Sequence, residues 1–110
     1  GTSTVVNDKV ETLAVKNAFH NLAAKIPVSS TKSMVGHPQG ASGGLGATVS
    51  LLSLHNNFLT PTINQENPDP ECDLDYISNK GREKQLDIAI SNCISFGSKN
   101  SALVLGKFSG

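Results

Sequence analysis

The sequence predicts a small α/β domain. Apolar residues recur at helical spacing in two segments, over about 8–22 and about 41–57. Closer to the end of the chain, 86–90 has the pattern of a half-buried strand, and 102–105 is a second short apolar run. Helices and strands of these lengths within 110 residues fit one domain of the α/β class.

The first helix is predicted over about 8–22. Asn7 and Asp8 are residue types that cap helices well, and Asp8 followed by Glu11 resembles a capping box. The apolar residues behind these caps return every three or four positions, as one face of a helix requires. After this helix, 27–29 is a candidate for a short buried strand.

The second helix is predicted over about 41–57, after a polar loop from Ser30 to Gly40. Its apolar residues point around more than one face, which predicts a largely buried helix. Four glycines fall between Gly40 and Gly46. Because each glycine inside a helix costs about 1 kcal/mol, this run predicts the close approach of another backbone or of a ligand, and close helix packing is the favoured account.

Residues 60–85 contain three of the five prolines and many polar side chains. A loop of this length is uncommon inside a compact domain, so we expect it to wrap a neighbouring surface. The two strand segments after it are expected to pair in antiparallel fashion, joined by a tight polar turn at Phe96–Asn100.

The composition argues against several classes of function. The formal net charge is zero, with 9 basic and 9 acidic residues and no basic stripe, so nucleic acid is not an expected partner. The longest apolar stretches are far too short to span a membrane, and no signal peptide is visible. We therefore expect a cytoplasmic location, or an organellar one in a eukaryote. The three histidines share no ligand spacing, so no metal site is expected.

The hydrophobic share of the chain is low. It amounts to 37%, against about 45–50% in typical globular domains. The sequence therefore predicts either a loop-rich domain or a piece that completes its core with a partner. The first four residues, Gly1–Thr4, have the character of a mid-loop segment and no Met opens the chain, so a cut or processed start is expected.

The loop before the second helix holds the best candidates for chemistry. Lys32 and His37 lie five residues apart just ahead of the helix N-terminus. A neutral imidazole there has one N–H to donate to a developing oxyanion. A surface loop with an incidental histidine is the competing interpretation. A nucleotide site is disfavoured, because no strand directly precedes the Gly40–Gly46 run and no acidic residue follows at the distance that ribose binding requires.

Further motifs stand in order along almost the whole chain, and together they are specific. They are Gly1–Thr4, Asn7-Asp8 with Glu11, Ser29–Ser33 with Gly36-His37, Gly40-Ala41, Pro61–Asn64, Pro68–Tyr76, Ser91-Asn92, and Phe96-Gly97 with Asn100. In this order they resemble the β-ketoacyl-acyl carrier protein synthase family, of the elongating, decarboxylating type.

The resemblance implies the thiolase fold, with a layered α-β-α arrangement and a mixed sheet. It makes residues 1–110 one C-terminal ketosynthase domain that lacks its first residues. The implied reaction is the decarboxylative Claisen condensation of malonyl-carrier protein with an acyl thioester, in fatty-acid or polyketide synthesis. The nucleophilic cysteine of such enzymes lies in their first half, so the isolated chain is expected to be inactive.

The resemblance also implies roles for individual residues. His37 matches the second of two histidines that stabilise the thioester enolate, and the first normally precedes Gly1 immediately. Lys32 matches a lysine that helps to hold that other histidine. The remaining matches bind substrate: the hydroxyls of Thr2 and Thr4 contact the pantetheine arm, and the gate includes Phe96 and Gly97.

The implied partners are an acyl carrier protein, whose phosphopantetheine carries the substrate, the N-terminal half of the same enzyme, and a second copy in a homodimer. No other cofactor is expected. Carrier-type members usually have a Glu nine residues after the second histidine, where this chain has Gly46, and the turn at 95–100 has fewer glycines than usual. A non-catalytic partner subunit of the chain-length factor type, or a stand-alone interaction module, therefore remains as an alternative.

Overall fold

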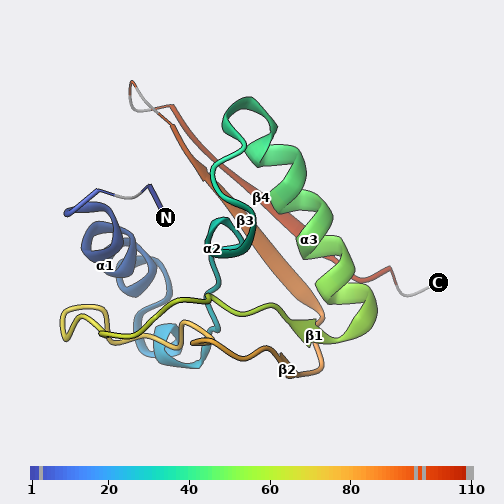
Figure 1. Cartoon of the computed structure of the whole chain (residues 1–110). Helices are drawn as coiled ribbons and strands as arrows, with labels where there is room; N and C mark the ends of the chain where they lie inside the picture. Colours follow the sequence, from blue (N-terminus) through green and yellow to red (C-terminus); the bar gives the residue numbers. More distant parts are fainter. Residues whose placement is uncertain (3, 96, 98, 109–110) are drawn as a thin grey trace.

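The computed structural model describes residues 1–2, 4–95, 97 and 99–108 and confirms the α/β class (Figure 1). The strands form two antiparallel pairs, and a single parallel bridge joins Thr62 to Ser78. The elements in chain order are α1 Asn7–Phe19, η1 His20–Lys25, α2 Lys32–Val35, η2 Gln39–Ala41, α3 Ser42–Asn56, β1 Phe58–Leu59, β2 Arg82–Glu83, β3 Ile88–Ile94 and β4 Asn100–Gly106.

The predicted antiparallel pair near the end of the chain is confirmed. β3 and β4 pair from Ile88 opposite Gly106 to Ile94 opposite Asn100. Both strands extend further toward their shared turn than the hydrophobic pattern predicted, because backbone pairing continues through the polar residues Ser91 and Asn92 of β3 and Asn100 and Ser101 of β4. Of the predicted turn, Phe96 lies outside the described residues, while Gly97 has φ +72°, a conformation that favours glycine.

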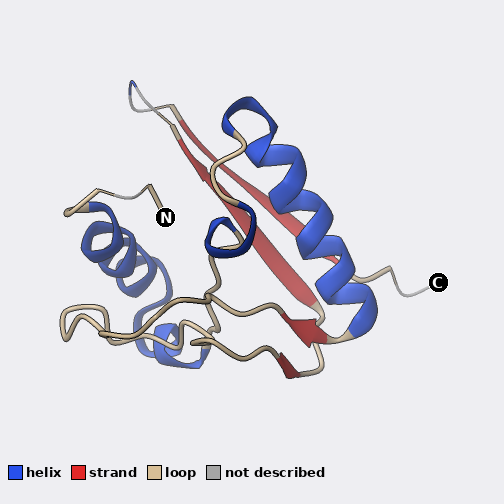
Figure 2. Cartoon of the chain, viewed as in Figure 1, coloured by secondary structure: helices blue, strands red, loops and turns tan. Residues whose placement is uncertain are grey.

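Helix α3 lies along one face of the β3–β4 hairpin (Figure 2). The closest approach is at Gly46, where an added Cβ would lie 2.5 Å from Oγ of Ser91 on β3. Close packing therefore explains this glycine. For Gly40, Gly43 and Gly44, an added Cβ would meet no atom within 4 Å in the described part of the chain, so the same explanation does not extend to them.

The opposite face of the hairpin is mostly apolar, and its residues are exposed in the described part of the chain. Side chains alternate between the two faces of a strand, and directly paired residues share a face. Ile88, at the end of the ladder, is 66% exposed, and Val104, in its interior, is 64% exposed. We call this the open sheet face. Its apolar residues are Ile88, Ile90, Ile94, Ala102 and Val104, and the polar residues Asn92 and Asn100 lie on the same face.

The extent of α3 was predicted well, but its burial was not. The helix ends where Asn57 adopts a left-handed conformation, φ 51° and ψ 43°. Within α3, Leu54 is buried, whereas Leu51 and Leu52 are more than half exposed. Among the described residues, α3 packs mainly on the β3–β4 hairpin and to a smaller extent on β1. The buried apolar residues of the described chain are Ala23, Leu54, Leu59 and Ile77, a small core that agrees with the low hydrophobic share.

The first helix differs from its prediction at both ends. It begins one residue early, so Asn7 and Asp8 lie inside α1, and no side chain caps the backbone there. Glu11 instead accepts a hydrogen bond from Nδ2 of Asn7 at 3.3 Å. The α-helix stops at Phe19 because His20 adopts φ 47°, and the chain continues as η1. The expected capping box is therefore absent from the described start of α1.

The strand predicted over 27–29 does not form in the described chain. Val28 donates its backbone N–H to the carbonyl of Asp75 at 2.7 Å, but no ladder develops around this single bond. Pro27 has no N–H with which to extend one.

The long loop does wrap a neighbouring surface, and that surface is α1. We call residues 64–76 the clasp loop. It meets α1 at positions 9, 12 and 16, which share one face of a helix. The contacts are Lys9 with Asp69 at 3.6 Å and with Glu71, buried Thr12 with the hydroxyl of Tyr76, and Lys16 with Asp73 at 2.5 Å.

An ion pair at the base of the clasp loop predicts sensitivity to acid. The hydrogen bond from the Arg82 guanidinium holds the pKa of the Asp75 carboxyl below its ordinary value. A lowered folded pKa means that the stabilisation is complete above about pH 4, the ordinary pKa of Asp, and is lost as the pH falls through the folded pKa. We expect a carboxyl ¹³C titration of the chain to place Asp75 below that value, and Arg82→Gln to raise it. An unchanged midpoint in the variant would contradict the assignment.

Candidate active site

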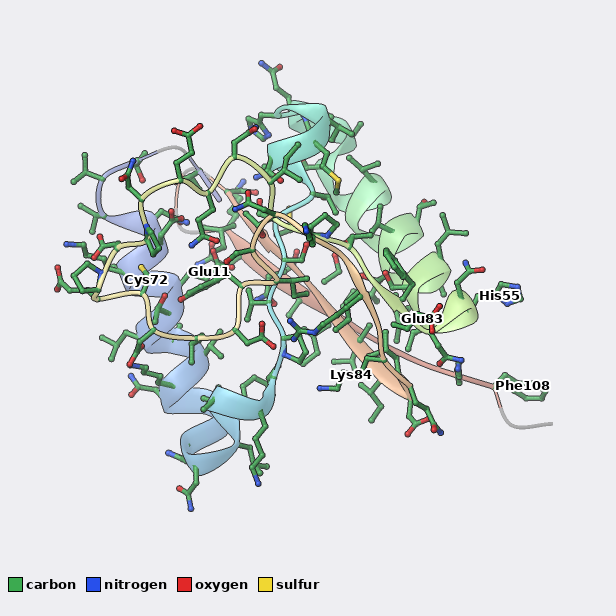
Figure 3. All side chains as sticks on the ribbon, turned by 60° about the horizontal axis from the view of Figure 1, so that its bottom comes forward. Glu11, His55, Cys72, Glu83, Lys84 and Phe108 are labelled. Carbon is green, nitrogen blue, oxygen red and sulfur yellow. The ribbon has the colours of Figure 1, made fainter. Side chains whose placement is uncertain are left out.

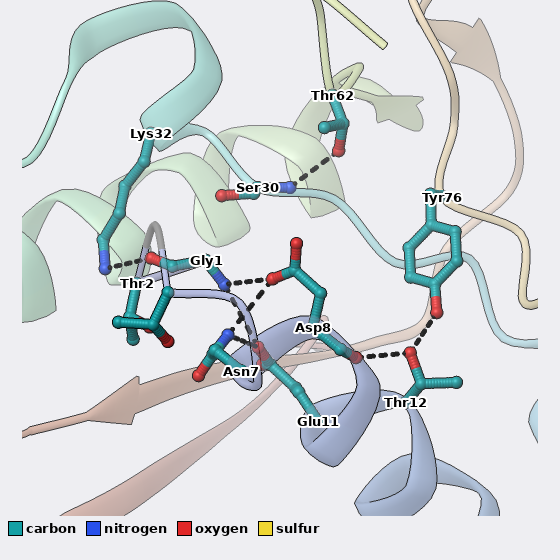
Figure 4. Close-up of polar contacts among 11 residues, drawn as sticks. Gly1, Thr2, Asn7, Asp8, Glu11, Thr12, Ser30, Lys32, Thr62 and Tyr76 are labelled. Carbon is teal, nitrogen blue, oxygen red and sulfur yellow. Dashed lines mark hydrogen bonds and ion pairs between the residues drawn. The ribbon is translucent and has the colours of Figure 1, made fainter. Parts of the chain in front are cut away.

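The candidate site is built around α2, a single helical turn. Its first residue, Lys32, extends toward the beginning of the chain, and its Nζ donates a hydrogen bond to the Gly1 carbonyl at 3.0 Å (Figure 4). Two residues that are 31 positions apart in sequence are thereby joined. The structure thus brings Lys32 together with the Gly1–Thr4 segment, as the motifs suggested.

The Gly1–Thr4 segment is also tied to α1 and to itself. Oγ1 of Thr2 and Oγ1 of Thr4 lie 2.8 Å apart, so the two hydroxyls form one polar pair on the exposed side of the segment. The backbone nitrogen of Gly1 lies 3.2 Å from a carboxylate oxygen of Glu11. Glu11 therefore contributes to the placement of this segment, a role that helix capping would not have given it.

His37 lies beyond α2 and just before α3, on an exposed stretch of chain. Gly36, with φ +75°, closes α2 and turns the chain toward it. Nδ1 of His37 is 3.3 Å from Oγ of Ser42, in the first turn of α3. Ser42 is thus the polar partner of the ring among the described residues, and the structure does not place Lys32 and His37 in direct hydrogen-bond contact there.

A second segment, residues 60–63, also contacts the helical turn that carries Lys32. The motifs included most of this segment without giving it a role. Chain segment 60–63 runs beside 29–33 and is joined to it by three hydrogen bonds, one of which appears in Figure 4. These join Oγ of Ser29 to Oγ1 of Thr60 at 3.3 Å, the N–H of Ser30 to Oγ1 of Thr62 at 2.9 Å, and the N–H of Ile63 to Oγ of Ser33 at 3.0 Å. The only sequence signal was the Pro61–Asn64 motif itself.

The structure gives less information on the two residues predicted to form the gate, Phe96 and Gly97. Phe96 lies outside the described residues, so its predicted role rests on the motif alone. Gly97 is exposed, and an added Cβ would have no neighbour within 4 Å in the described chain. Among the described residues, no group of three or more His, Cys, Asp or Glu side chains is arranged to hold a metal ion. None of the helices described is long and apolar enough to cross a membrane.

Known condensing enzymes resemble this chain over nearly its whole length. Residues 1–66 match the family described as beta-ketoacyl synthase, C-terminal domain. A 3-oxoacyl-[acyl-carrier-protein] synthase 2 of Synechocystis sp. is 49% identical over 108 residues, which make up 98% of this chain and 26% of that relative. The synthase of the same name from Coxiella burnetii is 48% identical and is covered to the same 26%. The chain thus spans about a quarter of the length of these relatives.

Solved structures agree at the level of the fold. A type II polyketide ketosynthase in complex with its acyl-carrier protein superimposes with a TM-score of 0.93 at 34% identity, over 99% of this chain and 27% of that one. The ishigamide ketosynthase/chain length factor superimposes with a TM-score of 0.92 at 36% identity, with the same coverage. Such agreement over nearly all of the chain means that its elements are arranged as they are in these proteins.

The fold and the arrangement around α2 therefore define part of a ketosynthase with the thiolase-like fold. The chain belongs to the beta-ketoacyl synthase family, within the C-terminal domain of that family.

Proposed function

We propose that this chain forms the C-terminal quarter of a 3-oxoacyl-acyl carrier protein synthase and, with the preceding part of that enzyme, extends acyl chains in fatty-acid synthesis. The observation that carries the proposal is the hydrogen bond from Lys32 to the Gly1 carbonyl. It brings the lysine to the position next to which the family's first histidine stands. His37 follows from the other end of the same short helix.

The proposed reaction has two half-reactions. In the first, a cysteine thiolate in the preceding part of the enzyme attacks the acyl thioester on carrier protein, the bond to the pantetheine sulfur breaks, and the pantetheine thiolate leaves. In the second, the bond between the α-carbon of malonyl-carrier protein and its carboxylate breaks, and carbon dioxide leaves. The electron pair stays on the α-carbon as an enolate, which attacks the acyl carbonyl carbon. The cysteine leaves as thiolate, and 3-oxoacyl-carrier protein is formed.

His37 is proposed to stabilise the enolate oxygen. In this role Oγ–H of Ser42 donates to Nδ1 of the ring, across the observed 3.3 Å, so that a neutral imidazole carries its proton on Nε2. Nε2–H then donates to the thioester oxygen as negative charge develops there. Lys32 is proposed to hold the histidine that precedes Gly1, and Thr2 and Thr4 to bind the pantetheine arm. Phe96 and Gly97 are proposed to gate the acyl pocket.

The partners, oligomeric state and location of the enzyme follow from the same proposal. An acyl carrier protein delivers both substrates on phosphopantetheine, so the enzyme needs no other cofactor. The full-length protein is proposed to be a homodimer. It is also proposed to lie in the cytoplasm, and the bacterial origin of the relatives supports this location. Residues 1–110 are proposed to act as one domain with the preceding polypeptide.

A non-catalytic subunit of the chain-length factor type is the second candidate. Two observations favour it: the TM-score of 0.92 with a ketosynthase/chain length factor structure, and the glycine at position 46, packed against Ser91. The residue at the nucleophile position of the preceding polypeptide discriminates between the candidates. A cysteine there supports the synthase, and a glutamine supports the partner subunit.

A chimera tests the proposed function directly. In it, this chain replaces the matching quarter of the Synechocystis relative. We expect the chimera to release carbon dioxide from malonyl-carrier protein and to form 3-oxoacyl product, while the isolated chain does neither. A chimera that has the elution volume and melting temperature of the intact relative, yet releases no carbon dioxide, would contradict the synthase assignment and favour the partner subunit.

A further inference from the structure

The orientation of α2 cannot come from α2 alone. The helix has four residues, and so short a helix does not form stably in isolation. Its two ends nevertheless determine where the proposed catalytic groups lie, because Lys32 is its first residue and His37 follows its last by two positions. A rotation of this single turn would move both groups together. The contacts that fix the turn therefore decide the geometry of the site.

Ser33 is the residue of α2 that ties it to the neighbouring segment. Its Oγ accepts a hydrogen bond from the backbone N–H of Ile63 at 3.0 Å and donates one to the Ser30 carbonyl at 2.8 Å. Donor and acceptor capacity of the hydroxyl are thus both used. Alanine at this position would remove both contacts at once.

Thr62 supplies the second tie, which reaches Ser30, two residues before α2 begins. Its Oγ1 accepts the backbone N–H of Ser30 at 2.9 Å (Figure 4). Ser30 is also the acceptor for Ser33, so the two ties meet at one residue. Together they fix both the entry into α2 and its first turn.

Thr62 is itself held firmly from the opposite side. Its backbone N–H donates to the carbonyl of Ile77 at 3.1 Å, and its carbonyl accepts from the N–H of Asn79 at 2.8 Å. Ile77 is 2% exposed and belongs to the small core. The Thr62 hydroxyl therefore connects the Lys32 turn to the best-packed part of the chain rather than to a free loop.

We propose that Thr62 and Ser33 are positioning residues of the active site, which orient α2 and through it Lys32 and His37. The inference rests on the proposed function, because it assumes that Lys32 and His37 act in decarboxylation. Neither hydroxyl touches the substrate. Loss of either hydroxyl is expected to slow the step that uses these groups without weakening substrate binding.

Thr62→Val in the chimera tests this role, because valine keeps the shape of threonine and removes only its hydroxyl. We expect kcat for release of carbon dioxide to fall about 10- to 100-fold, since small misplacements of catalytic groups have effects of this size. KM for malonyl-carrier protein should stay the same, as should the rate of acyl transfer to the enzyme. Thr62→Ser should restore kcat. Ser33→Ala should resemble Thr62→Val, and Ser33→Thr should be milder.

Thr48→Val is the matched control. It makes the same chemical change on α3, where, among the described residues, Oγ1 of Thr48 bonds the Gly44 carbonyl of its own helix at 2.9 Å and no other group. An equal fall in both half-reactions for Thr62→Val, or no fall in a folded variant, would overturn the positioning role. His37→Ala separates this failure from failure of the proposed function. If His37→Ala abolishes decarboxylation and Thr62→Val does not affect it, only the positioning inference is wrong.

Discussion

His37→Ala in the chimera is expected to lower kcat for release of carbon dioxide by about 10²- to 10³-fold, the usual effect of removing one preorganised donor from a developing oxyanion. The ring is exposed, and its described polar partner is Ser42. The variant should therefore fold normally. Acyl transfer to the enzyme should continue, because the proposed enolate forms only in the second half-reaction.

His55→Ala is the control for this experiment. His55 lies in the last turn of α3 and points away from the body of the molecule (Figure 3). The two substitutions remove the same side chain from the same chain, so a common effect on folding would appear in both. Radioactive carbon dioxide released from labelled malonyl-carrier protein measures the rate. Full activity of His37→Ala, or equal losses in both variants, would show that His37 does not have the proposed role.

The second large effect is expected on the open sheet face. Ile90 lies at its centre, opposite Val104. In the chimera the preceding polypeptide is expected to cover this face, because exposed apolar patches of this kind mark surfaces that meet another part of a protein. Ile90→Asp should then destabilise the chimera by more than about 3 kcal/mol, since it buries a charge without a partner. In the isolated chain the loss should be about 1 kcal/mol or less, because Ile90 is already partly in water.

Urea unfolding of both proteins measures this contrast. Asn67→Asp, on an exposed stretch of the clasp loop, adds the same charge at a place where no burial is expected and serves as control. The isolated chain itself should show a low melting temperature, because its buried core is small. Equal effects of Ile90→Asp in the chimera and in the isolated chain, or a high and cooperative transition of the isolated monomer, would contradict the expected cover.

The helices and strands with strong hydrophobic periodicity could be predicted from the sequence. Which parts of the protein cover them could not. The α3 boundaries followed from the apolar pattern and the glycine run, and the β3–β4 pairing followed from alternation. The burial of α3 was overestimated because hydrophobicity indicates that a helix has partners, not that those partners belong to the same chain. Leu51 and Leu52 are exposed for this reason.

Local chemistry was predicted less well where tertiary contacts override it. Asn7 and Asp8 have the right side chains for capping, yet both lie inside α1, and Asn7 bonds Glu11 instead. The ends of α1 depend on such contacts more than on propensity. The placement of Lys32 beside Gly1 was suggested only by the ordered motifs, and the supporting hydroxyls of Ser33 and Thr62 became apparent only from the fold.

The clasp loop has a practical consequence for labelling and protein engineering. Its composition is that of a replaceable linker, yet Tyr76 at its base contacts α1, and the following residue, Ile77, bonds Thr62, which supports the Lys32 turn. A tag or fluorophore inserted beside Tyr76 and Ile77 would disturb both the contact with α1 and the support of the Lys32 turn. Residues 66–68 of the clasp loop are exposed and precede the first ion pair to α1. This stretch is therefore the position at which foreign sequence is best introduced.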